Sequence, residues 1–117
     1  MSKDIAVRYF ESLKTHDAAK VAETFHPDIS SWDALAGAAQ GKANVTAAFA
    51  QLFQMMPDVA FEPVQYVIEG NKGAVEWIWT ATLPNGKLHI PGMDLMEFQD
   101  GLIRSIKFYY DPTPLKG

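Results

Sequence analysis

Two aspartates and a tyrosine, far apart in the chain, are the residues of this sequence best suited to acid–base chemistry. Asp94 lies in "PGMDLMEF", where the period of a strand places it on the same face as Met96 and Phe98. A carboxylate taken out of water without a partner usually stays protonated, because burial raises its pKa. Asp94 is therefore expected to be a neutral acid in an apolar site; the alternative is a hydrated carboxylate at the rim of the sheet.

Asp33 and Tyr9 could supply the complementary functions. Asp33 ends the segment "DISSWD", where it is either a turn cap or an ionised base at the mouth of a site. Tyr9 lies on an apolar helical stripe, where an ordinary core tyrosine is the simpler interpretation. A neutral acid and a phenol can both donate hydrogen bonds to one developing oxyanion while a separate carboxylate moves a proton. We therefore predict Tyr9, Asp33 and Asp94 as catalytic residues.

Other kinds of catalytic site find little support in the sequence. The chain contains no cysteine, and its three histidines do not form an HExxH pair, so we expect no metal site and no thiolate nucleophile. His26 in "FHPD" is expected to cap the end of a helix. The sequence also has no GxSxG motif and no glycine-rich phosphate loop. We predict that the protein uses no cofactor.

Aromatic and methionine side chains are numerous enough to line an apolar pocket beside these acids. In most folds such residues fill the core, but in a curved sheet some of them face a cavity suited to a flat hydrophobic ligand. The residues predicted to bind such a ligand are Trp32, Phe49, Phe53, Met56, Trp77, Trp79, Met96 and Phe98.

Helical periodicity dominates the first half of the chain. Residues 4–15 predict a helix, and Asp17 can cap a second, shorter one. A brief strand over 28–33 and a loop of small residues over 34–41 follow. Pro57 ends a third helix, whose apolar stripe is Val45, Phe49, Leu52, Phe53 and Met56.

Alternating periodicity replaces the helical pattern from Asp58 onward. Strands are predicted over 59–69, 74–82, 87–99 and 102–110, joined by the turns "GNKG", "PNG" and "DG". Pro63 predicts a bulge or an edge position in the first of them. Short connections make neighbouring strands antiparallel. The sequence thus predicts a single α+β domain over residues 1–117, with three N-terminal helices packed on a curved, mainly antiparallel sheet.

The sheet is expected to be apolar on both faces and so to need a second cover. Trp77 and Trp79 lie in one apolar row, whereas Met93 and Leu95 lie on the face opposite Asp94. A homodimer formed through the sheet is the simplest cover.

Charge and hydropathy limit the other possible partners of the protein and its cellular location. The net charge is −4 and the Lys and Arg residues are scattered, so no nucleic acid is expected as a partner. No segment has the pattern of a signal peptide or a membrane span, so we expect a cytoplasmic protein that does not enter a membrane.

The order of these elements resembles the nuclear transport factor 2-like superfamily over essentially the whole chain. The stretches that carry the resemblance are "RYFESLKTHDAAKVAETFHPDI", "GKANVTAAFAQLFQMMPDV" and "PGMDLMEFQDGLIRSIKFYYDP". The resemblance implies the cone-shaped α+β fold that ketosteroid isomerases share with SnoaL-like polyketide cyclases.

Similarity to the ketosteroid isomerases implies a role for each of the three catalytic candidates. Tyr9 would bind the oxyanion, Asp33 would shuttle the proton, and Asp94 would be the protonated, hydrogen-bonding acid. The sequence departs from some of these isomerases at two positions. Phe25 and Phe49 stand where those enzymes have tyrosines that support the oxyanion-binding tyrosine.

Three functions remain open on the sequence alone. The preferred one is a cofactor-free isomerase or cyclase that acts on a hydrophobic carbonyl compound by proton shuttling through an enolate. A SnoaL-like polyketide cyclase would instead use Asp94 as the acid/base residue of an aldol step. A non-catalytic small-molecule-binding or dimerisation module is the third, because a fold does not by itself decide function.

Overall fold

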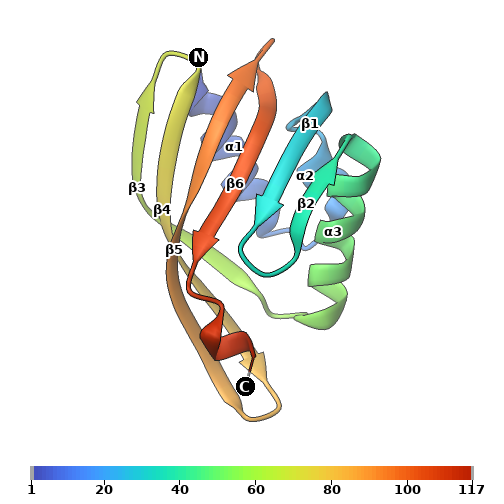
Figure 1. Ribbon diagram of the computed structural model, residues 1–117, viewed down its shortest axis with the longest axis vertical. Helices are drawn as coiled ribbons and strands as arrows, with labels where there is room; N and C mark the ends of the chain where they lie inside the picture. Colours follow the sequence, from blue (N-terminus) through green and yellow to red (C-terminus); the bar gives the residue numbers. More distant parts are fainter. Residues whose placement is uncertain (1, 117) are drawn as a thin grey trace.

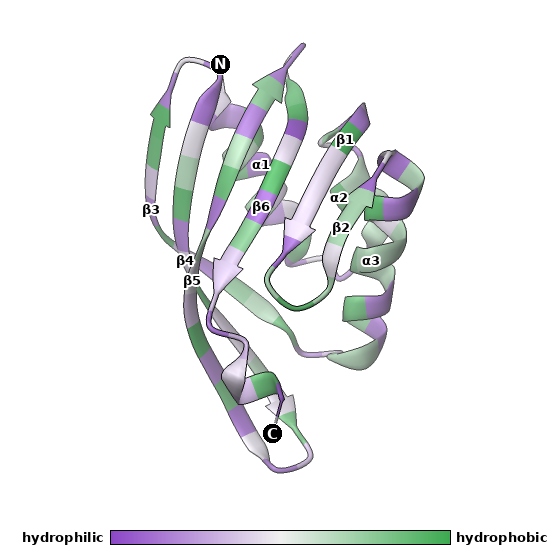
Figure 2. Ribbon diagram, in the orientation of Figure 1, coloured by the Kyte–Doolittle hydropathy of each residue, from purple (hydrophilic) through white to green (hydrophobic). Residues whose placement is uncertain are grey.

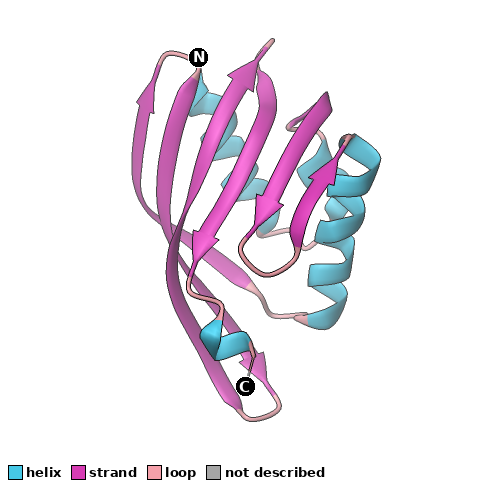
Figure 3. Ribbon diagram, viewed as in Figure 1, coloured by secondary structure: helices cyan, strands magenta, loops and turns pink. Residues whose placement is uncertain are grey.

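A layer of helices lies against one face of a curved sheet in the computed structural model, which describes residues 2–116 (Figures 1 and 3). The helices are α1 (Ser2–Leu13), α2 (Ala18–Ala22) and α3 (Lys42–Met55), and a short 3-10 helix, η1 (Thr113–Leu115), follows the sheet. The strands are β1 (Phe25–Asp33), β2 (Gly37–Gln40), β3 (Ala60–Glu69), β4 (Lys72–Leu83), β5 (Gly86–Gln99) and β6 (Leu102–Tyr110). This arrangement confirms the predicted α+β architecture.

The sheet is open and mainly antiparallel. Its strand order is β2-β1-β6-β5-β4-β3, in which β1 and β6 run parallel and every other neighbouring pair is antiparallel. β3 is an edge strand, and its register with β4 shifts between Pro63 and Gln65. Both the edge position and the bulge predicted from Pro63 are therefore confirmed, because a residue without an N–H is tolerated in such places.

Two predictions for the segment between the second and third helices were wrong. The expected loop over 34–41 contains β2, because the turn after Asp33 folds the chain back against β1. His26 does not end a helix, since α2 is already closed by its C-cap at Glu23. His26 lies on β1 instead, where its Nδ1 accepts a hydrogen bond of 3.0 Å from the Asp28 N–H.

The inner face of the sheet, toward the helices, carries the buried apolar residues of the strands. Hydrophobic and hydrophilic residues are interspersed along the strands (Figure 2). Alternate residues of β4 and β5 are buried there, so the period-2 prediction holds for both strands. In β6 the register shifts opposite Glu97 and Phe98, so that Ile103 is fully buried and Leu102 is only half-buried. α1 closes the core from the other side with Ile5, Tyr9, Phe10 and Leu13.

The β4–β5 hairpin is long and reaches past the helices, with η1 beside it (Figure 1). The Thr82 N–H donates to Asp58 Oδ1 at 3.0 Å, which ties the far part of β4 to the turn that follows α3. The hairpin therefore extends one wall of the space between the sheet and the helices. No helix within residues 2–116 is long and apolar enough to cross a membrane.

Candidate active site

A cavity of about 700 Å³ lies between the helices and the inner face of the sheet. Its walls are mainly apolar, with Phe49 and Met56 from the helical side and Trp77 and Trp79 from the sheet. Tyr9, Asp33 and Asp94 all line this one cavity. The structure thus brings together three residues that the sequence separates widely.

Asp94 is an acid held in an apolar wall. It lies on β5 and is 1% exposed, and its Oδ1 accepts a hydrogen bond of 2.9 Å from the indole Nε1 of Trp77. Burial raises the pKa of Asp94 well above its ordinary value; the bond from Trp77 lowers the pKa, and the charge of Asp33 raises it. Because burial is the largest of these effects, the neutral acid is favoured. With Oδ1 occupied by the indole, Oδ2 is the atom left to carry the proton.

Asp33 has the opposite surroundings. Its Oδ1 accepts hydrogen bonds from the backbone N–H groups of Leu35 and Ala36, at 2.8 and 3.0 Å, and from the hydroxyl of Tyr110 at 2.6 Å. Oδ2 accepts none of these bonds, so it is the oxygen free to take a proton from a ligand.

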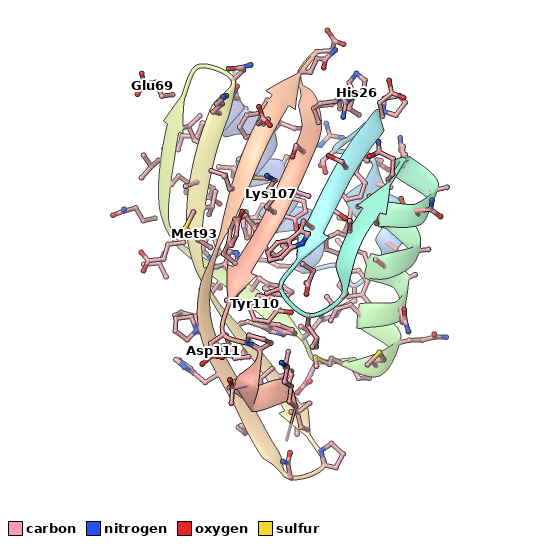
Figure 4. All side chains as sticks on the ribbon, viewed as in Figure 1. His26, Glu69, Met93, Lys107, Tyr110 and Asp111 are labelled. Atoms are coloured by element: carbon pink, nitrogen blue, oxygen red, sulfur yellow. The ribbon has the colours of Figure 1, made fainter. Side chains whose placement is uncertain are left out.

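Tyr110 is a functional candidate that the sequence analysis missed. It lies at the end of β6 (Figure 4), and its hydroxyl donates to Asp33 Oδ1. Burial, the hydrogen bond to Asp33 and the charge of Asp33 raise the pKa of Tyr110, so it remains a phenol and a donor. The parallel pairing of β1 with β6 sets Phe108 beside Asp33 and Tyr110 two residues beyond, and no local pattern in the sequence indicates that pairing.

Tyr9 lies on α1 and lines the cavity. The residue is 1% exposed, and burial followed by the charge of Asp94 raises its pKa well above the ordinary value. Among residues 2–116, no partner accepts a hydrogen bond from its hydroxyl, and the centroids of the Phe25 and Phe49 rings lie 6.5 and 6.1 Å from that of the Tyr9 ring. Because its pKa is raised, Tyr9 stays protonated and able to donate.

The predicted ligand-binding residues divide into two groups. Phe49, Met56, Trp77 and Trp79 line the cavity, as do Phe61 and Phe108, which the sequence analysis did not select. The four others do not line it. Phe53, Met96 and Phe98 are buried behind the wall, and Trp32 is 37% exposed and stacks on Tyr109 at 5.3 Å. The expectation for Trp32 is corrected because adjacent residues of a strand point to opposite faces, and its neighbour Asp33 takes the inner one.

The site offers no evident metal ligands. Within the part of the chain that the structure describes, no group of three or more His, Cys, Asp or Glu side chains is arranged to hold a metal ion. One apolar space is faced by a carboxylic acid that burial favours in its neutral form, a carboxyl group that accepts three hydrogen bonds, and the phenol of Tyr9.

The raised pKa of Asp94 predicts a pH-dependent cost to stability. Above the ordinary value of 3.8, the unfolded chain releases this proton while the folded chain keeps it, so each further pH unit lowers the free energy of unfolding by about 1.4 kcal/mol. Asp94→Asn removes this loss. Urea unfolding from about pH 4 to 8 should show the variant gaining on the unmodified protein as pH rises, until folded Asp94 itself ionises. A constant difference would mean that Asp94 is a hydrated rim carboxylate.

Comparison with solved structures identifies the fold. A protein described as a SnoaL-like polyketide cyclase from Jannaschia sp. is 19% identical, with a TM-score of 0.86 and coverage of 98% of this chain and 88% of its own. A protein with a ketosteroid isomerase-like fold from Catenulispora acidiphila, in complex with trimethylamine, is 15% identical at a TM-score of 0.86, with coverage of 95% and 88%. TerC, co-crystallised with polyporic acid, is 14% identical at a TM-score of 0.87, with coverage of 98% and 95%. The fold is therefore the nuclear transport factor 2-like, ketosteroid isomerase-like fold.

The family follows from the sequence itself. The family model for the SnoaL-like domain matches residues 6–106, and the chain belongs to that family. No curated protein matches the chain closely enough to add a function.

Proposed function

We propose that this protein is a cofactor-free isomerase or cyclase that acts on a hydrophobic carbonyl compound. The observation that carries the proposal is the pair of carboxylates in one apolar cavity, where Asp94 is kept neutral by burial and Asp33 is surrounded by donors. Environments that hold two acids in opposite protonation states assign one as donor and the other as base. Membership of the SnoaL-like family supports a cyclase or isomerase type of chemistry.

The reaction begins with the carbonyl group of the ligand between Tyr9 and Asp94. The Tyr9 hydroxyl and the Asp94 Oδ2–H donate to the carbonyl oxygen, while Asp33 Oδ2 takes a proton from the carbon beside it. The electron pair of that C–H bond moves to the oxygen, which forms an enolate. In an isomerase Asp33 returns the same proton to a different carbon. All of the atoms stay in the substrate, and no oxidant or reductant is needed.

A polyketide cyclase is the closely related alternative. There Asp94 would be the acid/base residue: it would give its proton to a second carbonyl oxygen as the enolate carbon attacks that carbonyl carbon to form a ring, and it would recover a proton from the carbon that forms the enolate. The structure favours Asp94 as the donor in either reaction, because its proton is retained by burial.

A fluorescent naphthol tests the donors without a known substrate. Naphtholate mimics the oxyanion, so it should bind the cavity through Tyr9 and Asp94, and Tyr9→Phe and Asp94→Asn should each weaken binding by about tenfold or more. The emission spectrum reports which ionisation state of the naphthol is bound. Ser12→Ala, a change on α1 that removes no group lining the cavity, is the control.

Either outcome of that titration is informative. Weaker binding in both variants would justify a screen of unsaturated ketones and polyketides for turnover. A naphthol affinity that is unchanged in both variants would exclude the oxyanion site and favour a non-catalytic binding module with the same fold.

We also propose that the outer face of the sheet packs against a second copy of the chain. Val67, Leu95 and Tyr109 are 58%, 41% and 41% exposed there, around a shallow hollow of about 450 Å³ that Val67, Met93 and Tyr109 help to line. Exposed apolar residues gathered on one face often mark an association surface. Sedimentation equilibrium should find a dimer that Leu95→Lys weakens, whereas a monomeric unmodified protein would exclude it. The cytoplasmic location stays a prediction.

A further inference from the structure

Two large apolar side chains lie at the mouth of the cavity and are only partly covered. Leu35, in the turn that joins β1 to β2, is 50% exposed, and Met55, in the last turn of α3, is 67% exposed. Both line the cavity, whereas Tyr9 and Asp94, at its buried end, are each 1% exposed. The cavity therefore runs from two buried polar groups to an apolar opening.

The exposure of these two side chains has a free-energy cost that a ligand could remove. Apolar surface is stabilised when it leaves water, by an amount roughly proportional to its area. A cavity of about 700 Å³ also lies within the range that encloses a drug-sized ligand. Such a ligand, with its carbonyl oxygen at Tyr9 and Asp94, would extend toward the opening. Its far end would then cover Leu35 and Met55.

Leu35 differs from Met55 because it is joined directly to the proposed base. The backbone N–H groups of Leu35 and Ala36 donate to Asp33 Oδ1 at 2.8 and 3.0 Å, so the turn itself holds the carboxyl group. β2, which follows the turn, is an edge strand of the sheet. An exposed turn beside an edge strand belongs to the parts of a protein that open most easily. A group that packs on Leu35 from inside the cavity therefore also restrains Asp33.

We infer that Leu35 determines both which ligands bind and how well Asp33 is positioned. The hydrophobic end of the ligand packs between Leu35 and Met55, and its contact with Leu35 holds the turn that carries the base. Binding energy from a part of the ligand that does not react is in this way used to orient the base. Leu35 is thus a positioning residue, whereas Met55 only binds.

This inference rests on the proposed function and narrows its substrate class. The ligand is a carbonyl compound with an apolar group, either a ring or an alkyl chain, at the end remote from the carbonyl. Compounds without that group leave Leu35 and Met55 exposed, so they bind less tightly and react more slowly.

A series of fluorescent naphthols tests the contact at the mouth. 2-Naphthol and its 6-methyl, 6-ethyl and 6-propyl derivatives share the hydroxyl that Tyr9 and Asp94 bind, and differ only in the length of the apolar end. Affinity for the unmodified protein should rise by up to about fourfold for each added carbon, the usual gain from burying a CH₂ group. Leu35→Ala and Met55→Ala should each lower the total gain by about threefold or more. Val64→Ala, at an exposed apolar residue of β3 that does not line the cavity, is the control and should retain it.

A kinetic comparison separates positioning from contact. Two β,γ-unsaturated ketones of fused rings, with and without a propyl group at the end remote from the carbonyl, are compared by deuterium exchange in D₂O at saturating concentration. The propylated ketone should exchange faster, by roughly three- to tenfold. Leu35→Ala keeps the backbone N–H groups but should abolish this advantage. Met55→Ala should keep the advantage and only raise the concentration needed for saturation. Both positions are exposed, so neither substitution should disturb the fold.

The outcomes distinguish this inference from the proposed function. If the naphthols bind and weaken with Tyr9→Phe, but chain length has no effect or has the same effect in Leu35→Ala, the contact at the mouth is overturned and the oxyanion site stands. An advantage of the propylated ketone that is lost equally in Leu35→Ala and Met55→Ala, or in neither, would overturn the positioning role of Leu35. If no naphthol binds the unmodified protein, the proposed function fails and this inference fails with it.

Discussion

Asp33→Asn is expected to lower kcat by about 10²- to 10⁴-fold while changing the affinity for naphthols by no more than about twofold. The asparagine amide can still accept at Oδ1 from Leu35, Ala36 and Tyr110, so the turn should keep its shape. What disappears is the charged oxygen that takes the proton. Binding and chemistry therefore separate in this variant, whereas loss of Tyr9 or Asp94 affects both.

Proton transfer can be followed before the natural substrate is known. A β,γ-unsaturated ketone of fused rings is incubated in D₂O, and NMR follows the entry of deuterium at the carbons next to the carbonyl. Asp28→Asn, an exposed acid on the same strand that does not line the cavity, is the matched control and should exchange at the normal rate. Exchange that survives Asp33→Asn but stops in Asp94→Asn would transfer the acid/base role to Asp94, as in the cyclase alternative.

Gly92→Ala is expected to destabilise the protein by about 1–3 kcal/mol and to weaken naphthol binding as well. Gly92 pairs with Trp77 across β4 and β5. A Cβ there would lie 2.6 Å from Cη2 and 2.8 Å from Cζ3 of the Trp77 ring, and 2.8 Å from the carbonyl oxygen of Tyr109. The ring would have to move, and with it the N–H that holds Oδ1 of Asp94. The substitution of Gly92 should therefore also disturb Asp94, through the displaced ring of Trp77.

A double substitution tests whether Gly92→Ala acts by displacing the Trp77 ring or by a general loss of packing. Trp77→Phe removes the ring atoms that an added methyl group would meet, so Gly92→Ala should cost less in the Trp77→Phe background than alone. Urea unfolding of the four proteins gives the coupling energy. Additive losses would place the conflict at the Tyr109 carbonyl and would leave Asp94 undisturbed, with naphthol affinity unchanged in Gly92→Ala.

Local patterns were enough to predict one half of the site. Asp94 and the tryptophans of β4 lie on strands with regular alternation, and period 2 alone fixes which face a residue takes. Tyr9 followed in the same way from the stripe of α1. The resemblance in element order then supplied their roles. In such segments the sequence fixes side-chain direction without knowledge of any distant contact.

Pairing between strands that are far apart in the chain determines the other half of the site, and no local pattern in the sequence indicates that pairing. The hydrogen bond of Asp33 to Tyr110 depends on a parallel pairing of β1 with β6, which no short connection announces. β2 is a strand because it pairs with β1, although its small residues do not favour strand formation.

The bond between Asp33 and Tyr110 joins residues 77 positions apart, and this has a consequence for the order of folding. Contacts of such long range form slowly, because the chain between them must lose its freedom before the pairing is rewarded. Until β6 docks on β1, Asp33 has its local bonds from Leu35 and Ala36 but lacks the bond from the Tyr110 hydroxyl. The helices and the β3–β5 meander can form first through contacts closer in sequence. Recovery of activity should therefore lag behind recovery of tryptophan fluorescence during refolding, which makes catalysis a late reporter of the native state.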